Sequence, residues 1–358
     1  MSKSNLLAID LAKSSFQVHL ATAQGQALVR KKVSRKALTD FVSQADATIV
    51  AMEACAGANY WGRRFVALGR EVRLMAPQYV KPFVKTNKTD ANDAEAIAEA
   101  ASRDSMRFVP VKTVAQQDIS SLHCIRSRLV AARTALTNQI RGLVAEYGVV
   151  IAKGPSKLRA FFAELDTENT FRGDLTPFML RKLGVLRAEL RLFDEQIAGC
   201  DAEVQQLCDQ DKVCGELTKI VGIGPLTATA LRAVSGDMSQ FRNGRQFAAF
   251  LGLVPRQNST GGKTKLLGIS KRGDTYVRTL LIHGARASLI SAHKRDDYRS
   301  RWVTKLKEAK GMNRAAVALA NRNARTVFAL LRRGETFDAT RPQQQATGQS
   351  FKREAAVG

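Results

Sequence analysis

Residues 85–98, KTNKTDANDAEAIA, are the stretch around which the rest of this chain can be placed. They predict a basic loop that becomes a helix at Asp90. Asp90 and Asp93 are three residues apart, so they share one face of that helix. One explanation is capping, because Asp90 suits the N-cap position and Asp93 suits the free N–H groups of the first turn. Two further acids favour a second explanation.

Each of these further acids ends an apolar, strand-like segment. Asp10 follows LLAI, and Glu53 follows IVAM. Carboxylates at two strand ends and one helix start can converge on one point, where they would repel one another without a positive charge between them. Oxygen-rich sites of this kind suit Mg²⁺ or Mn²⁺, and a pair of such ions can hold the attacking and leaving oxygens of a phosphodiester. We therefore expect a metal site formed by Asp10, Glu53, Asp90 and Asp93.

The charge of the chain predicts a polyanionic partner. Its 358 residues have an ordinary hydrophobic content of 45% and a formal net charge of +24. Such an excess favours nucleic acid over a membrane surface. Residues 213–333 contain 23 Lys and Arg against 6 Asp and Glu, a net of +17. This part of the chain is therefore the stronger candidate for a phosphate-binding surface.

Cysteine usage and hydropathy indicate a cytoplasmic protein with no membrane partner. The five cysteines form no CxxC pair, so they are expected to be reduced core residues. No apolar run is long enough for a membrane helix, and the N-terminus lacks a signal-peptide pattern.

Four regions are expected along the chain. Residues 1–110 alternate strand and helix patterns, with Ser34 expected to cap the first helix, and predict an α/β region with a mixed sheet. Residues 111–212 predict a mainly α, coiled-coil region. Residues 213–335 predict a helical domain. Residues 336–358 are polar and rich in Gln, which predicts a disordered tail.

The central region predicts two long helices. Leucines recur every seven residues from Leu122 to Leu143, and apolar residues alternate at spacings of three and four over residues 183–207. We expect a helical hairpin or coiled coil that spaces the domains or joins subunits. The alternative is a helical core within one chain. Gly154-Pro155, Gly173 and Pro177 predict shorter irregular pieces between the two helices.

Residues 220–228, IVGIGPLTA, predict a helix-hairpin-helix. Gly222 and Gly224 allow a tight turn, and Pro225 suits the first position of the next helix. The N–H groups at that helix start can bind a phosphate without reading sequence. The alternative is a simple helix end followed by a new helix.

A second glycine-rich segment, residues 252–274, is basic and contains Ser259 close to Gly261 and Gly262. From residue types alone, this is a flexible loop serine that hydrogen-bonds a phosphate. The candidate nucleic-acid contacts of the chain are Lys85, Lys88, Gly222, Gly224, Arg256, Lys263, Lys265, Lys271, Arg272 and Arg278.

Several of these segments resemble one insertion-sequence transposase family. AID at residues 8–10, MEA at 52–54 and KTDANDA at 88–94 resemble its D-E-D-D tetrad. GLVPRQ at 252–257 and ISKRG at 269–273 are similar to its C-terminal transposase domain. That family includes the Piv-type invertases and recombinases guided by a structured noncoding bridge RNA. The resemblance implies a ribonuclease-H-like fold of the RuvC type for the N-terminal region.

The resemblance also implies a mechanism, that of an RNA-guided DNA recombinase. Ser259 would be the nucleophile that forms a phosphoserine bond, and the four acids would bind Mg²⁺ or Mn²⁺. If the family motif is aligned one residue later, Thr260 takes the position of the nucleophile. The implied partners are donor and target DNA, a structured guide RNA and further copies of the chain in a dimer or tetramer. Two alternatives are a metal-dependent nuclease or Holliday-junction resolvase without a covalent intermediate, and a non-enzymatic nucleic-acid-binding protein.

Overall fold

The computed structural model describes residues 5–85, 89–167, 175–236, 238–261 and 263–338. The chain divides into two compact units, Met1–Gln206 with Thr229–Gln240, and Leu207–Ala228 with Phe241–Gly358. None of the helices in the described ranges is long and apolar enough to cross a membrane.

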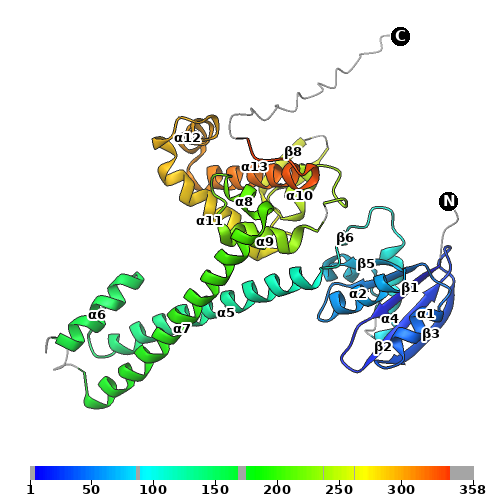
Figure 1. Ribbon diagram of the computed structural model, residues 1–358, viewed down its shortest axis with the longest axis horizontal. Helices are drawn as coiled ribbons and strands as arrows, with labels where there is room; N and C mark the ends of the chain where they lie inside the picture. The colour runs from blue at the N-terminus through cyan, green and yellow to red at the C-terminus, as the bar shows by residue number, and fades with distance from the viewer. Residues whose placement is uncertain (1–4, 86–88, 168–174, 237, 262, 339–358) are drawn as a thin grey trace, which may run out of the picture. The chain divides into compact units, whose positions relative to one another are not determined.

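The first unit is built on a six-stranded mixed sheet in the order β3-β2-β1-β4-β5-β6 (Figure 1). Its strands are β1 Leu6–Asp10, β2 Ser15–Ala21, β3 Ala27–Ser34, β4 Ile49–Glu53, β5 Glu71–Met75 and β6 Phe108–Val109. β4 lies parallel to β1 and β5, and the other neighbouring pairs are antiparallel. The expected N-terminal mixed sheet is confirmed. β6 was not expected, because two residues are too few to show a strand period.

Helices cover both faces of this sheet. On one face, α1 (Leu38–Gln44) and α2 (Ala58–Ala67) bury Trp61 and Phe65, and the ring of Trp61 lies 5.2 Å from that of Phe16. On the other face lie α3 (Pro77–Val80), the short helix η1 (Lys81–Phe83) and α4 (Asp90–Ala101). The side of α4 that packs on the sheet consists mostly of alanines, and these small side chains allow α4 to lie close to the strands.

One local expectation in this unit is wrong. Ser34 ends β3 and does not cap the next helix, because α1 begins only at Leu38.

The central region forms a helical hairpin within the first unit. α5 (Val114–Ala145) and α7 (Pro177–Gln210) run antiparallel, as the ion pairs Arg126–Asp201 and Arg133–Asp194 show. Leu129, Ile197 and Cys200 form part of the apolar contact between them. The apolar seam is thus occupied by a helix of the same chain, which agrees with the alternative of a core within one chain. Coiled-coil geometry and a role in joining subunits stay predictions.

The residues between these helices are more regular than expected. α6 (Pro155–Thr167) is a helix of 13 residues, and its Phe161 and Phe162 are buried against the end of the hairpin. Pro155 suits the first helical position, so the Gly154-Pro155 pair starts a helix and does not mark an irregular segment.

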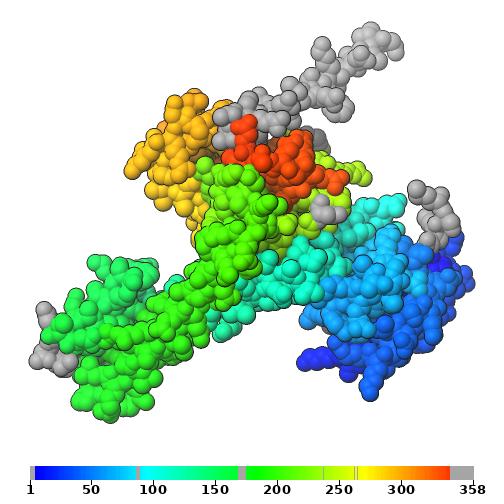
Figure 2. Space-filling model, viewed as in Figure 1, coloured from blue at the N-terminus to red at the C-terminus, as the bar shows by residue number. Residues whose placement is uncertain are grey.

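The second unit is mainly helical and packs around its last helix. Its elements are α8 Lys212–Thr218, the start of α9 Pro225–Ser235, α10 Gly244–Phe250, β7 Pro255–Thr260, β8 Lys263–Ile269, α11 Thr275–Ser291, η2 Ala292–Lys294, α12 Tyr298–Lys310 and α13 Met312–Arg333. α13 buries Leu319 and Val327 in this core. In the space-filling view, α12 (orange) and α13 (red) lie side by side at the surface (Figure 2).

The segment after α13 contacts the second unit through Phe337. The backbone N–H of Phe337 donates to Glu216 Oε2 at 2.9 Å, and the Phe337 ring lies 5.3 Å from the Arg299 guanidinium. Phe337 thus contacts the second unit, and a disordered tail at 336–358 stays a prediction. Residues 339–358 lie outside the described part.

Candidate active site

The sheet places two of the four predicted acids next to each other. β1 and β4 are parallel neighbours with Ile9 opposite Met52, so Asp10 and Glu53 follow at the same edge of the sheet. Both are partly buried. Burial raises the pKa of the nearby Cys55 thiol, and the negative charges of Glu53 and Asp10 raise it further. The expected convergence of the two strand ends is therefore present.

The other two acids lie in the first turn of α4, but Asp90 is not the cap. Thr89 is extended and its Oγ1 accepts a hydrogen bond from the backbone N–H of Asn92 at 3.2 Å. Asp90 is thus the first helical residue and is exposed, whereas Asp93 is partly buried. The capping explanation fails for Asp90 because the preceding threonine already satisfies that N–H.

A test of this cap compares two alanine variants. Thr89→Ala is expected to destabilise α4 by about 0.5–2 kcal/mol, because it leaves the Asn92 N–H without its acceptor. Asp90→Ala should cost only about 0.3–1 kcal/mol, the usual gain of an acid near a helix N-terminus. Hydrogen exchange of the α4 amides measures both changes. A larger loss of protection in Asp90→Ala would contradict the assignment of Thr89.

The four acids do not form a metal site as they stand. Across the described ranges, no group of three or more His, Cys, Asp or Glu residues is arranged to hold a metal ion. The strand register places Asp10 beside Glu53, and a spacing of three residues on α4 places Asp90 near Asp93. Of the basic residues predicted beside α4, Lys85 forms an ion pair with Glu95 at 2.8 Å. Lys88 lies outside the described residues.

Ser259 lies on a β-hairpin and not in the flexible loop that was expected. It sits in β7 opposite Thr264 of β8, and its Oγ lies 2.7 Å from the Gln257 side-chain Nε2, which donates to it. Side chains two residues apart on a strand share a face, so Gln257 and Ser259 point to one side and Thr260 to the other. Every residue of β7 is exposed. The hairpin thus presents one hydroxyl in a fixed direction.

The hairpin that carries Ser259 is basic. Lys265 lies opposite Asn258 and Lys263 opposite Thr260, so the side chains of both lysines are on the face of the hairpin opposite to Ser259. No Asp or Glu occurs from Gly252 to Gly273. The exposed basic residues of this segment are Arg256, Lys263, Lys265, Lys271 and Arg272. They agree with the predicted phosphate-binding surface.

Arg278, unlike the exposed basic residues of the hairpin segment, is buried. It is 6% exposed, and its guanidinium donates to the carbonyls of Leu251 and Arg272 and to Thr275 Oγ1 at 3.0–3.2 Å. These bonds tie α11 to the base of the hairpin. The prediction that Arg278 contacts nucleic acid is therefore not retained, because all of these donors face the interior of the unit.

The glycines at 222 and 224 differ in what they do. Gly222 has a φ of +90°, and a Cβ there would lie 2.9 Å from Ser288 Oγ and 3.1 Å from the Gly284 backbone. Gly222 is thus required by close packing against α11. A Cβ at Gly224 would meet open space, and Pro225 begins α9 as expected. A phosphate contact in a helix-hairpin-helix stays a prediction.

The sequence analysis missed a basic groove in the second unit. α13 carries Arg314, Asn321, Arg322 and Arg325 along one side of the helix, and all four line the groove. The sequence signal that could have indicated the groove is the helical spacing of these arginines within an alanine-rich segment. Arg245, from the distant α10, joins them through the fold.

Two family models match the chain. A model described as "Transposase", of the DEDD IS110 type, matches residues 7–149. A model described as "Transposase IS116/IS110/IS902 family" matches residues 214–301. The first match covers the sheet with its acids and part of the helical hairpin, and the second covers the serine hairpin.

Similar proteins align over nearly the whole chain. A "Probable family 20 transposase" of Pseudomonas aeruginosa is 49% identical over 91% of this chain and 96% of its own length. A "Transposase for insertion sequence element IS1111A" of Coxiella burnetii is 47% identical over 94% and 92%. A "Transposase for insertion sequence element IS1328" of Yersinia enterocolitica is 39% identical over 94% and 99%. These sequence alignments therefore cover both compact units of the chain.

Proposed function

The chain belongs to the IS110/IS116 family of insertion-sequence transposases, and from this membership we propose that it is an RNA-guided DNA recombinase whose nucleophile is Ser259. Membership makes it an enzyme that cuts and rejoins DNA, which argues against a non-enzymatic binding protein. The covalent serine and the guide RNA are the proposal. The observation that carries it is an exposed hydroxyl held in one direction on a basic hairpin.

The proposed chemistry conserves the phosphodiester energy. Ser259 Oγ attacks the phosphorus and loses its proton, a Ser–O–P bond forms, and the bond from phosphorus to one sugar oxygen breaks. That sugar oxygen leaves as a hydroxyl and takes up a proton. A hydroxyl of another strand then attacks the phosphoserine and releases Ser259, so no ATP is needed. The hydrogen bond from Gln257 orients the Oγ before attack.

The acids fit a divalent cation through their chemistry and charge. Asp10 and Glu53 are neighbouring carboxylates whose field already raises the pKa of Cys55, and a cation would relieve that field. They would hold Mg²⁺ or Mn²⁺ together with Asp90 and Asp93. A bound ion of this kind polarises a phosphoryl oxygen.

The remaining features of the proposal concern partners and organisation. The exposed basic residues of the segment from Gly252 to Gly273 would bind phosphates of DNA or of a structured guide RNA. The serine hairpin and the acids would meet between subunits in a dimer or tetramer. We further propose a cytoplasmic protein with a catalytic region at 1–110, a helical region at 111–212, a transposase domain at 213–335 and a C-terminal tail.

A metal-dependent nuclease or junction resolvase is the second candidate. The adjacency of Asp10 and Glu53 favours it, because that pair exists independently of Ser259. Water would then be the nucleophile, and Ser259 would only contact a phosphate. Formation of a covalent protein–DNA adduct separates the two candidates.

RNA guidance is tested by rewriting the RNA. The protein is produced together with the DNA that flanks its gene, and the RNA that copurifies is sequenced. Changing the segments of that RNA that pair with the target should redirect recombination to matching DNA, because base pairing reads sequence while protein reads shape. Scrambling its unpaired segments is the control. Unchanged target choice after rewriting would refute guidance and leave DNA recognition to the protein.

A further inference from the structure

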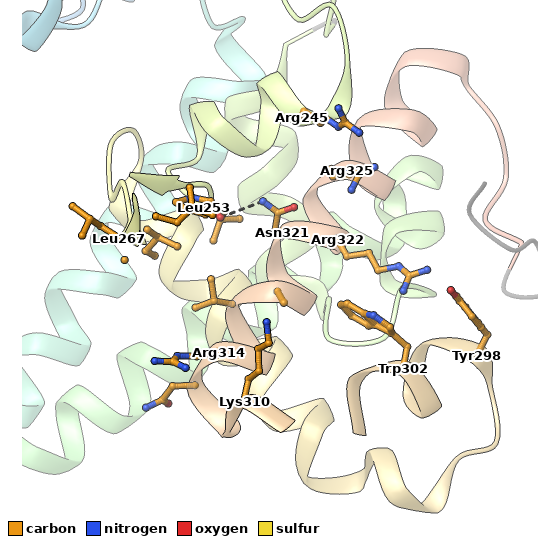
Figure 3. Close-up of a pocket in the computed structure, with 17 residues that line it drawn as sticks. Arg245, Leu253, Leu267, Tyr298, Trp302, Lys310, Arg314, Asn321, Arg322 and Arg325 are labelled. Carbon is orange, nitrogen blue, oxygen red and sulfur yellow. Dashed lines mark hydrogen bonds between the residues drawn. The ribbon is translucent and has the colours of Figure 1, made fainter. Parts of the chain in front are cut away.

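A groove with a volume of about 1330 Å³ lies in the second unit (Figure 3). Its walls come from α12, α13 and the base of the β7–β8 hairpin, with one residue from α10. Five cationic side chains line it, and no acidic residue does. These cations are Arg245, Lys310, Arg314, Arg322 and Arg325. The groove therefore has a strongly positive potential and is suited to a polyanion.

Aromatic rings lie beside these cations. The guanidinium of Arg322 is 4.7 Å from the centre of the Trp302 ring and 5.0 Å from that of Tyr298. Figure 3 shows all three at one end of the groove. Partial burial of Arg299 and then the like charge of Arg322 lower the pKa of Arg299 to about 10. A flat ligand could stack on Trp302 while its charge meets Arg322.

Three of the cations that line the groove have no acidic partner in the described part of the unit. No carboxylate there forms an ion pair with Arg245, Arg314 or Arg325. Burial lowers the pKa of Arg325, and the charges of Arg245 and Arg322 lower it further. Close packing of α10 on α13 causes this proximity, since a Cβ at Gly244 would lie 3.1 Å from the Arg325 backbone. An anion would relieve this repulsion.

The rest of the lining is apolar and continuous with the serine hairpin. Leu266 and Leu267 of β8 are 65% and 40% exposed and line the groove with Val317. Asn321 joins α13 to the hairpin base by donating to the carbonyl of Leu253 at 3.1 Å, drawn as the dashed line in Figure 3. β8 pairs with β7, which carries Ser259. A ligand in the groove therefore lies on the element that presents the serine.

We propose that this groove binds a single strand of DNA, with an unpaired base stacked on Trp302 and phosphates at Arg314 and Arg325. A base inside a duplex has both faces covered, so only an unpaired strand can stack on an aromatic side chain. Deoxyribose fits the apolar lining better than ribose, because a 2′-hydroxyl buried against leucines would lack a hydrogen-bond partner. The choice of DNA rests on the proposed function, whereas the binding chemistry does not.

The fluorescence of Trp302 can report the binding of a ligand in the groove. The chain has two tryptophans, and the other, Trp61, is buried in the sheet core. The full-length protein carrying Trp61→Phe and Ser259→Ala therefore leaves Trp302 as the only tryptophan and prevents any covalent step. A single-stranded DNA 12-mer in EDTA should quench its fluorescence. The duplex and the RNA of the same sequence should bind at least five-fold more weakly.

Matched variants test the residues, with binding read from the anisotropy of the labelled 12-mer. Trp302→Leu should weaken binding about 5- to 150-fold, the range for losing one stacked base, while Trp302→Phe should retain most of it. Arg314→Gln and Arg325→Gln should each reduce the slope of log K against log salt by about 0.7. Arg332→Gln, exposed on α13 outside the groove, should leave the slope unchanged.

The outcomes of this test are independent of the recombination mechanism, because neither Ser259 nor a metal takes part. Wild-type affinity in folded Trp302→Leu protein would overturn the proposal. So would duplex DNA or RNA that quenches Trp302 as strongly as the single strand does. Absence of a serine adduct in active enzyme would instead count against the proposed function and leave this site intact.

Discussion

Ser259→Ala is expected to abolish strand exchange and every covalent protein–DNA adduct while nucleic-acid binding persists. The variant loses one hydroxyl on an exposed strand and one hydrogen bond from Gln257. The free energy of unfolding should therefore change by no more than about 0.5 kcal/mol. A nicked DNA substrate that traps the intermediate should give a denaturation-resistant adduct with the wild type only. Peptide mapping should place the nucleotide on Ser259.

Thr260 supplies the matched control. Its side chain points to the opposite face of β7, so Thr260→Ala should keep the adduct. An adduct mapped to Thr260 would show that Thr260 is the nucleophile and that the family motif was aligned wrongly by one residue. An active recombinase that never forms a serine-linked product would leave water as the nucleophile, which is the nuclease alternative.

Asp10→Asn and Glu53→Gln are each expected to abolish metal-dependent cleavage and also to lower the pKa of Cys55. Both replacements keep the shape of the side chain and remove one negative charge. The pKa of Cys55 is raised by burial and then by these two charges, so its thiolate should form at lower pH in either variant. Alkylation of Cys55 as a function of pH, followed by mass spectrometry, measures this shift without any DNA.

The same thiol reports on the metal. Mg²⁺ bound between Asp10 and Glu53 should lower the pKa of Cys55 in the wild type and have a smaller effect in Asp10→Asn. Asp104→Asn, an exposed loop acid, is the control and should change neither cleavage nor the thiol. Full cleavage activity in Asp10→Asn would contradict the catalytic role of the acids. An unchanged Cys55 titration would contradict the electrostatic coupling.

The sheet and its acid pair could be predicted from the sequence because both depend on local patterns. The apolar runs that end at Asp10 and Glu53 are short strands, and parallel pairing then places both acids at the same edge. The position of Ser259 could not be predicted in this way. Its segment is polar and rich in glycine, which is typical of a loop, and only pairing of β7 with β8 makes it a hairpin.

Other errors arose because charge alone does not reveal burial. Arg278 looks like its basic neighbours in the sequence, yet it is buried by bonds to three groups that converge only in the fold. Likewise, the heptad pattern of α7 indicates an apolar partner helix but not its source, and α5 of the same chain supplies it. The basic groove needs residues from α10, the hairpin, α12 and α13 together, so no single segment could indicate it.

The contact between Gly222 and Gly284 limits how this enzyme can be varied in the laboratory. A Cβ on either residue would overlap the backbone around the other, and Gly222 also has a positive φ. Because no residue is smaller than glycine, a substitution at one position has no compensating substitution at the other. Libraries that aim to retarget or accelerate the enzyme should therefore hold both positions fixed and place their diversity at exposed positions outside the serine hairpin, where side chains can change without repacking.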